Sequence, residues 1–456
     1  MTDTTLPPGP SKRNLFQFMK FIAHPLPILE ECRRMYGKTF TLRFSGQPDS
    51  VVISDPIDLK QVFSATPEQL NSGEMNATLL QPILGDYSLL TLDGKKHLQH
   101  RKLLLPSFHG QRMKDYGELM SKIAKRRVSN WKQNNTLKLV DEVREITFDI
   151  ILNAIFGMDE DSSRFKTLTK SLHDLNHVIS RPYSVITLLT PFLHRNLGFL
   201  TPWAKIMRLR QAVDACLFEE ISARQKMNLD SRIDILSLLL QARDEEGKLM
   251  TAQEIRDEML TLLLAGHETS TTGIAWSFYG ILSNPHVLKK LKDELHQFVS
   301  DDTELVSNLD KLVYLDATIK EALRITPIFP YLLRITNEPY QLRGQTIPKG
   351  TIISLCMYLA HHDPEHWTEP HKFMPDRFLN STESPYTYLP FGSGIRRCIG
   401  SAFAQYEMKI IIAQILMHLE LKLKDNYIAK PERKGPVIAP SGGVPIIIQK
   451  ILHQYA

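Results

Sequence analysis

The chain has 456 residues, 43% of them hydrophobic, and carries a formal net charge of +5. This length allows a large core, and with so mild a charge we expect no nucleic-acid partner. Since no Gly/Ser linker, low-complexity tract or internal repeat divides the sequence, we predict an extended lead over residues 1–10 and one large domain over residues 11–456.

The four cysteines, Cys32, Cys216, Cys356 and Cys398, lie far apart without paired spacing. This pattern favours a reducing compartment over a disulfide framework, and we expect the first three to be core thiols. The N-terminus lacks the apolar core of a signal peptide, and no apolar run approaches the ~20 residues that span a bilayer. We therefore predict a soluble, cytoplasmic protein without a transmembrane anchor.

The N-terminal part predicts a helix at 26–35 and two strands of a small sheet at 39–44 and 51–54. Gly73, Pro82 and Gly85 interrupt residues 68–90, so the residues alone favour an irregular surface loop there. Residues 94–108 predict a basic helix. On it, His97 and Arg101 are four residues apart and share a face.

Long helical patterns fill the middle of the chain, at 111–132, 139–156, 163–179 and 201–225. Between the last two, residues 184–200 are apolar and contain Pro191. Phe192, Phe199 and Trp203 could line an entrance, contact a membrane surface or belong to the core, and the residues leave these alternatives open.

The next helix carries an unusual turn. Thr251 and Glu254 form a capping box that begins it, and it continues through residues 259–264, which are almost entirely apolar. Its middle reads Ala265-Gly266-His267-Glu268-Thr269, and a mid-helix glycine costs about 1 kcal/mol relative to alanine. A weak, polar turn inside an otherwise apolar helix indicates a functional role.

Two charged motifs follow. Glu321 and Arg324 are three residues apart on a helix predicted at 314–326, a spacing that is most often an exposed ion pair of little energy. Arg377 follows in Pro375-Asp376-Arg377-Phe378. Residues 437–448, interrupted at 441–443 by Ser-Gly-Gly, predict a β-hairpin.

The stretch at 391–400 reads FGSGIRRCIG and precedes a helix predicted at 401–418. Cys398 thus falls at a loop-to-helix junction, where unpaired N–H groups and the helix dipole favour an anion. The thiolate is the form of cysteine that ligates metals. Gly392 and Gly394 allow backbone angles closed to other residues, and Gly400 leaves room for a flat group. A single thiolate favours an axial haem ligand over zinc or an iron–sulfur cluster.

This stretch resembles Phe-x-x-Gly-x-Arg-x-Cys-x-Gly, the haem-ligand loop of the cytochrome P-450 superfamily of haem-thiolate monooxygenases. Residues 265–269, 321–324 and 375–378 match three further motifs of that family in the same order: Ala-Gly-x-(Glu/Asp)-Thr, Glu-x-x-Arg and Pro-x-Arg-Phe. The resemblance covers nearly the whole chain. It implies the mainly α P-450 fold, a large helical bundle around haem with a small β-rich region.

The resemblance also implies roles for individual residues. Thr269 would donate a hydrogen bond to the oxygen of the co-substrate O2, and Glu268 would help to relay protons. Glu321, Arg324 and Arg377 would form a structural network that braces the cysteine loop. Haem b would be bound by Cys398, the iron ligand, and by His97 (where the family more often has Trp), Arg101, Arg334, Arg396, Phe391, Ala265, Gly266 and Gly400.

In the family, residues 68–90 form a loop and short helix over the substrate, and residues 328–331 and the C-terminal hairpin also face it. The implied pocket residues are Met75, Leu79, Leu80, Ile83, Ile328, Phe329 and Tyr331. The helix at 265–269 and the segment at 439–443 resemble bacterial, especially cyanobacterial, members linked to long-chain fatty acids and terpenes. We expect hydroxylation of an unactivated C–H bond of a long-chain fatty acid, with a sesquiterpenoid as the alternative.

No flavin or iron–sulfur domain is fused to the chain, so electrons are expected from a ferredoxin or flavodoxin with its reductase, and we predict a monomer. A peroxide-driven peroxygenase would lack the Glu268–Thr269 pair. A non-catalytic haem-binding sensor or carrier would need neither Thr269 nor a redox partner. An acidic redox partner could dock on five positively charged residues: Lys95, Lys96, Lys102, Arg397 and Lys409. For any one of these lysines, an ordinary solvent-exposed surface is the simpler explanation.

Overall fold

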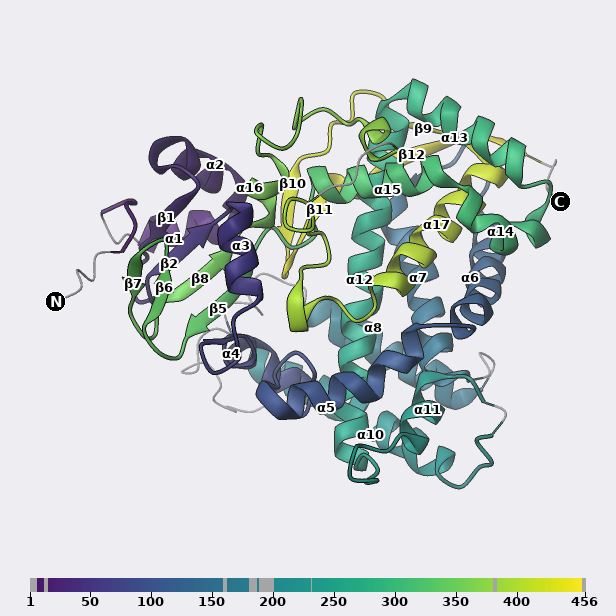
Figure 1. The fold of residues 1–456 in the computed structure, drawn as a ribbon. Helices are drawn as coiled ribbons and strands as arrows, with labels where there is room; N and C mark the ends of the chain where they lie inside the picture. The colour runs from purple at the N-terminus through teal and green to yellow at the C-terminus, as the bar shows by residue number, and fades with distance from the viewer. Residues whose placement is uncertain are drawn as a thin grey trace. The chain divides into compact units, whose positions relative to one another are not determined.

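The computed structural model describes residues 6–11, 15–158, 162–179, 187, 201–230, 232–379 and 384–452 (Figure 1). They group into two compact units, each built from segments far apart in the sequence. The first unit comprises 1–70, 113–148 and 268–456, and the second comprises 71–112 and 149–267. Among the described residues, no helix combines the length and apolarity that crossing a membrane requires.

A five-stranded sheet with the order β1-β2-β8-β5-β3 lies in the first unit (Figure 1, left). β1 and β2 are antiparallel, as are β5 and β8, whereas β2 and β8 run parallel. An apolar cluster lies on each face of the sheet, and neighbouring residues of one strand belong to different clusters, because alternate residues point to opposite sides. Val51 and Ile353 belong to one core cluster, which α3 covers with Leu59, while Val52 belongs to another, which α2 covers with Leu29. The bounds are α2 (Pro25–Tyr36), β1 (Thr39–Leu42), β2 (Ser50–Ile53), α3 (Pro56–Phe63), β3 (Leu70–Asn71), β5 (Leu332–Thr336) and β8 (Ile352–Leu355).

Three smaller sheets complete the strands: β4-β12-β9, β10-β11 and β6-β7. The predicted hairpin over 437–448 is wrong, because β11 pairs with β10, and β12 pairs with β4 and β9. Gly442, Gly443 and Val444 have positive φ angles of 72°, 77° and 53°, and this turn directs the chain from one sheet into another. The bounds are β4 (Thr136–Lys138), β6 (Tyr340–Leu342), β7 (Gln345–Ile347), β9 (Leu419–Leu423), β10 (Pro431–Lys434), β11 (Val437–Pro440) and β12 (Pro445–Ile451).

The remaining helices of the first unit follow local sequence signals closely. Buried residues cover nearly the whole middle of α17, whose bounds match the predicted helix at 401–418. The bounds are α1 (Leu15–Ala23), α6 (Arg112–Val128), α13 (Pro285–Phe298), α14 (Asp302–Asn308), α15 (Val313–Ile325), α16 (Met357–His361) and α17 (Ser401–His418), with short 3₁₀ turns at η4 (Leu309–Lys311), η5 (Pro375–Phe378), η6 (Gly394–Arg396) and η7 (Ser441–Gly443).

The second unit is helical, and α8 packs along α10. Its helices are α4 (Gly73–Leu84), α5 (Gly94–Leu104) with η1 (Leu105–Phe108), α8 (Ser163–Ile179), α10 (Pro202–Arg224) and α11 (Ile235–Gln241). The predicted irregular loop at 68–90 is wrong, since α4 spans three turns of it. Gly73 and Gly85 bound this helix, and Pro82 lies in its last turn, where side chains from other elements bind the end carbonyls.

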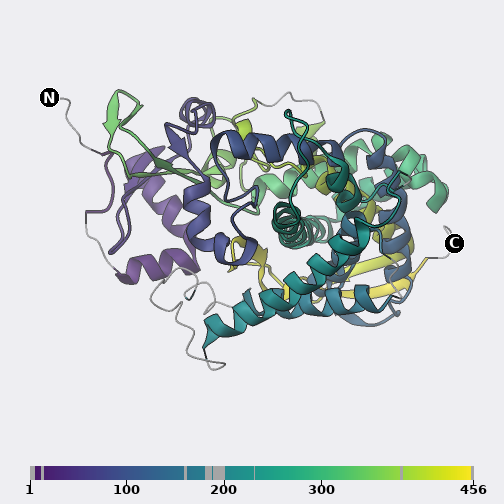
Figure 2. The ribbon, with the colours of Figure 1, turned by 90° about the horizontal axis from the view of Figure 1, so that it is seen from below.

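Two long helices, α7 (Leu139–Phe156) and α12 (Ala252–Ser283), contribute residues to both units. α12 runs vertically in Figure 1 and is seen end-on in Figure 2. It begins at the predicted capping box: the Thr251 backbone N–H donates to the Glu254 carboxylate at 2.7 Å, and the Glu254 N–H donates to the Thr251 hydroxyl at 3.2 Å. The predicted entrance residues Phe192 and Phe199 lie outside the described residues, while Trp203 lies in the first turn of α10.

Candidate functional site

The cysteine loop has the local geometry of a ligand-presenting turn. Cys398 lies just before α17, its backbone N–H donates to the Phe391 carbonyl at 3.0 Å, and its side chain is exposed. Gly394 has a φ of 66°, and a Cβ there would overlap the Phe63 carbonyl oxygen, so only glycine fits. A Cβ at Gly400 would meet nothing within 4 Å. An exposed thiol beside this open glycine suits the axial face of a flat macrocycle, and the donor set therefore fits haem.

A buried ionic network lies beside this loop, and it joins the three residues predicted to form it. The Arg324 guanidinium donates to both Glu321 carboxylate oxygens at 2.7 and 3.0 Å, and Arg377 donates to Glu321 at 3.1 Å. Arg324 and Arg377 also lie over the Trp367 ring, at 5.0 and 5.9 Å from its centre. Because Glu321 and Arg324 are wholly buried, each needs the other to compensate its charge.

His361 connects this network to the cysteine loop. Its Nε2 accepts the Leu389 backbone N–H at 2.7 Å, and its Nδ1 lies 3.2 Å from the Arg324 carbonyl. Burial lowers the pKa of His361 well below its usual range, so the ring is neutral and its Nδ1–H donates to that carbonyl. Leu389 is two residues before Phe391. We missed His361 in the sequence, where no spacing signal marks it.

The acid–alcohol turn of α12 is more accessible than the helix around it. Residues on both sides are buried, whereas Ala265 is exposed and Glu268 and Thr269 are partly buried. The Arg144 guanidinium, on α7, donates to both Glu268 carboxylate oxygens at 3.1 and 3.2 Å. Burial opposes the charge of Arg144, but the hydrogen bonds and charge of Glu268 outweigh it and raise the Arg144 pKa. Arg144 was not predicted, because no local pattern pairs it with Glu268.

A buried carboxyl group lies near the same turn. Glu407, on α17, is 1% exposed, and burial raises its pKa to about 8, with the nearby Ser270 hydroxyl partly offsetting the shift. Within the described residues, neither carboxylate oxygen makes a hydrogen bond of good geometry. Glu407 is therefore mainly protonated at neutral pH. One acidic residue among apolar neighbours in α17 is the signal that could have identified it.

The other residues predicted to bind haem are distributed over both units. In the second unit, His97 is buried and Arg101 is partly buried, one turn apart on α5. Gly266 is packed so closely that a Cβ would lie 2.8 Å from the Ile151 side chain. In the first unit, buried Arg334 on β5 donates to the Leu333 carbonyl at 2.9 Å, and Arg396 ends η6.

The predicted pocket residues divide between α4 and the segment at 328–331. On α4, Met75, Leu79 and Ile83 are spaced four residues apart and share one face, with Leu80 beside them. In the other segment, Ile328 lies near Gly273 of α12, and Phe329 packs against one cluster of the sheet core. Tyr331 stacks on Phe21 at 5.6 Å, and its hydroxyl accepts a hydrogen bond from Arg433 at 3.0 Å, so its contacts are with the N-terminal core.

Comparison with known sequences agrees with these observations. The family model described as "Cytochrome P450" matches residues 6–445. The "Putative cytochrome P450 135B1" of Mycobacterium tuberculosis is 33% identical over 445 residues, which cover 97% of this chain and 91% of the relative. The "Putative cytochrome P450 138" of the same organism is 32% identical over 447 residues, covering 98% and 96%.

Solved structures confirm the predicted fold. Retinoic acid-bound cyanobacterial CYP120A1 superposes with a TM-score of 0.86 at 24% identity, covering 98% of this chain and all of the other. The haem domain of cytochrome P450DA gives 0.84 at 23% identity, covering 98% of both chains. At such identities the likeness shows the fold alone. The family match and the mycobacterial relatives carry the assignment further: the chain belongs to the cytochrome P-450 family and is a haem-thiolate monooxygenase that uses O2.

Proposed function

We propose that this enzyme hydroxylates an unactivated C–H bond of a long-chain fatty acid. The observation that carries the proposal is the apolar face of α4, where Met75, Leu79 and Ile83 repeat every four residues over two turns. At 1.5 Å per residue, this strip extends about 12 Å, and it is aliphatic throughout. A narrow aliphatic strip suits an extended alkyl chain. A sesquiterpene or other terpenoid is the second candidate, because the structurally similar CYP120A1 was solved with retinoic acid bound.

In the proposed reaction, Cys398 would ligate haem b, and Arg101, Arg334 and Arg396 would neutralise its propionates, with His97 as a further donor. The bound haem supplies O2 activation and C–H bond chemistry. Thr269 donates a hydrogen bond beside the site where O2 reacts, and Glu268 accepts protons from solvent and passes them to Thr269. Arg144 orients the Glu268 carboxylate through its two hydrogen bonds. The network of Glu321, Arg324 and Arg377 keeps the cysteine loop in place.

Electrons come, in this proposal, from a ferredoxin or flavodoxin with its reductase. Lys95, Lys96 and Arg397 are exposed and offer positive charge for an acidic partner. Lys102 forms an exposed ion pair with Glu245. Lys409 does not support the predicted role in docking, because its side chain is 15% exposed and is ion-paired with Asp316 at 3.0 Å.

The substrate is tested by an optical titration of the ferric protein with palmitate and, in parallel, with a sesquiterpene alcohol. A substrate that enters the haem pocket would change the surroundings of the haem and shift the Soret band. We expect saturable shifts with palmitate. A shift with the sesquiterpene alone would establish the second candidate, and silence from both would reject the fatty-acid assignment.

The Thr269→Ala variant tests the catalytic class. In a monooxygenase that uses Thr269, electron consumption continues while product formation falls by about 10-fold or more, because Thr269 no longer helps to deliver protons. Coupling is measured as product formed per NAD(P)H consumed. Unchanged coupling would overturn the role of Thr269, and a sensor or carrier would form no product in either variant.

A further inference from the structure

The C-terminal end of α4 is held by two arginines from other helices of the second unit. Arg256 of α12 donates to the Leu84 carbonyl at 2.7 Å and to the Ile83 carbonyl at 3.4 Å, and Arg210 of α10 donates to the Pro82 carbonyl at 2.9 Å. The last carbonyls of a helix have no partners within it, and the helix dipole makes them negative. Two guanidinium groups therefore compensate the partial negative charge at the C-terminal end of α4.

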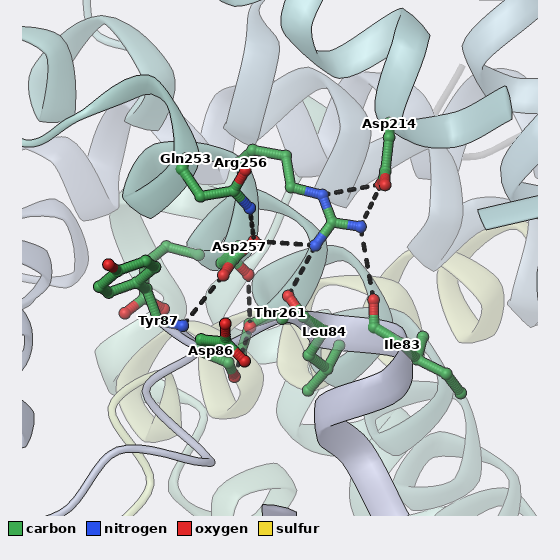
Figure 3. A network of polar contacts seen from close by, with 12 residues as sticks. Ile83, Leu84, Asp86, Tyr87, Asp214, Gln253, Arg256, Asp257 and Thr261 are labelled. Carbon is green, nitrogen blue, oxygen red and sulfur yellow. Dashed lines mark hydrogen bonds and ion pairs between the residues drawn. The ribbon is translucent and has the colours of Figure 1, made fainter. Parts of the chain in front are cut away.

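Both arginines pair with Asp214, which is also on α10, and Asp257 places a second negative charge beside Arg256. Arg256 is completely buried, and two of its N–H groups donate to the Asp214 carboxylate (Figure 3). Arg210 lies 3.5 Å from the other oxygen of Asp214. A buried charge is stable only when it is paired and hydrogen-bonded. Loss of Asp214 would remove a carboxylate that both arginines share, so the two guanidinium groups would repel each other more strongly, with Asp257 still paired to Arg256.

Asp257 fixes the chain just beyond α4. Its carboxylate accepts the Tyr87 backbone N–H at 2.9 Å, the Gln253 amide at 2.7 Å and Arg256 at 2.9 Å (Figure 3). Gly85 has a φ of 99°, and a Cβ there would overlap the Asp257 carboxylate. The end of α4 is thus fastened to α12 by Asp257 and Arg256, and to α10 by Arg210 and Asp214.

We propose that Arg210, Asp214 and Arg256 form a clasp that positions α4 and thereby determines how tightly its apolar strip binds a ligand. The three are positioning residues, because they act through the last backbone carbonyls of α4. Met75 and Leu79 project from the helix whose end the clasp holds. The inference rests on the proposed function in one respect, namely that the apolar face of α4 contacts the substrate.

The test compares Asp214→Asn with Glu219→Gln in the haem-loaded full chain. Both replace a carboxylate of α10 with its amide, but Glu219 is 63% exposed, and its ion-pair partner among the described residues is the exposed Arg164. Hydrogen exchange is read on peptides covering 73–84. We expect Asp214→Asn to speed exchange there about 10-fold while peptides of α17 stay unchanged, because a broken clasp opens α4 locally. Glu219→Gln should leave all peptides unchanged.

Ligand affinity is measured on the same variants by optical titration with palmitate and with phenylimidazole, an apolar ligand that binds haem iron directly. We expect Asp214→Asn to weaken both ligands at least about 5-fold, since an unfastened α4 must be ordered on binding. Unchanged exchange in α4, or faster exchange with unchanged affinity for both ligands, would overturn the clasp.

Two outcomes need a further comparison to test the clasp. If palmitate fails to bind the wild type while phenylimidazole binding weakens in Asp214→Asn, the clasp stands and only the fatty-acid assignment fails. If Asp214→Asn does not retain haem, Arg210→Gln decides, because Arg210 is partly exposed and its loss leaves Arg256 paired. Arg210→Gln should speed exchange in α4, and an unchanged rate would contradict the proposal.

Discussion

Glu268 of α12 forms an ion pair with Arg144 of α7, and this pair is partly open to solvent. Both side chains are about one quarter exposed, at 22% and 25%, so protons can reach the pair while the guanidinium still holds the carboxylate. The same mutual attraction that raises the pKa of Arg144 favours the ionised form of Glu268. The ion pair therefore favours the ionised carboxylate, which is the form of Glu268 that the proposed proton relay requires.

Arg144→Gln should lower coupling at reduced pH. Without the guanidinium, the Glu268 carboxylate loses its partner positive charge, so the acid limb of the pH profile for product per electron should move to higher pH. Arg144→Lys should restore most of the profile. Asp141→Asn is the control, because Asp141 contacts Arg144 at 3.1 Å but leaves Glu268 in place. A profile that does not move in Arg144→Gln would contradict this role.

Glu407 should make stability depend on pH. Its folded-state pKa of about 8 lies above the ordinary value of 4.5, so between those values the folded state holds a proton that the unfolded state releases. This contribution is complete below about pH 4.5 and is lost as the pH rises through 8. Glu407→Gln should therefore gain stability relative to the wild type between pH 5 and pH 8.5, by roughly 3 to 5 kcal/mol. Parallel melting curves at both pH values measure it, and equal pH slopes for the two proteins would refute it.

At the scale of elements, two constraints require glycine at position 394 in the turn before α17: a positive φ angle and close contact with the Phe63 carbonyl. Gly394 and Gly435 have similar positive φ angles of 66° and 57°. Only Gly394 faces the Phe63 carbonyl, whereas a Cβ at Gly435 would meet nothing within 4 Å. Alanine substitution at these two glycines therefore distinguishes the energetic cost of a left-handed backbone from the cost of a steric clash with Phe63.

Gly435→Ala should lower the free energy of unfolding by about 1 kcal/mol, the cost of a left-handed alanine. Gly394→Ala should lower it by about 3 kcal/mol or more and weaken haem retention, because the loop must shift away from Phe63. Denaturant unfolding and the carbon monoxide difference spectrum provide the two measurements. Equal losses in both variants would show that the Phe63 contact is unimportant.

At the scale of the whole molecule, surface charge should govern the encounter with the redox partner. The net charge is +5, and exposed Arg397 lies next to Cys398. The rate of reduction by an acidic ferredoxin should fall severalfold as ionic strength rises from about 0.02 to about 0.2 M, because salt screens exposed charges. Arg397→Ala should reduce both the rate and its salt dependence. Lys450→Ala, on β12, is the control, and an equal effect of both variants would argue against docking near Cys398.

Much of the fold could be predicted from the sequence because its signals are local. The helices at 139–156 and 163–179 end where their apolar periodicity ends, and the capping box at Thr251 marks the start of α12. The cysteine loop could be identified in the same way, since its glycines and Cys398 stand next to each other. A residue's own neighbours in the chain determine these features.

Only the tertiary structure decided which side chains meet. Arg144 and Glu268 are 124 residues apart, and Arg256 lies 172 residues from the Leu84 carbonyl that it caps. α4 was predicted as a loop because its end is stabilised by those distant arginines rather than by its own sequence, and Glu407 is protonated because of what surrounds it. The sequence by itself determined most of the helices and the family, and it singled out Cys398 as the proposed haem ligand. Partners, burial and pKa shifts required the folded chain, because they depend on groups that the sequence keeps far apart and packing brings together.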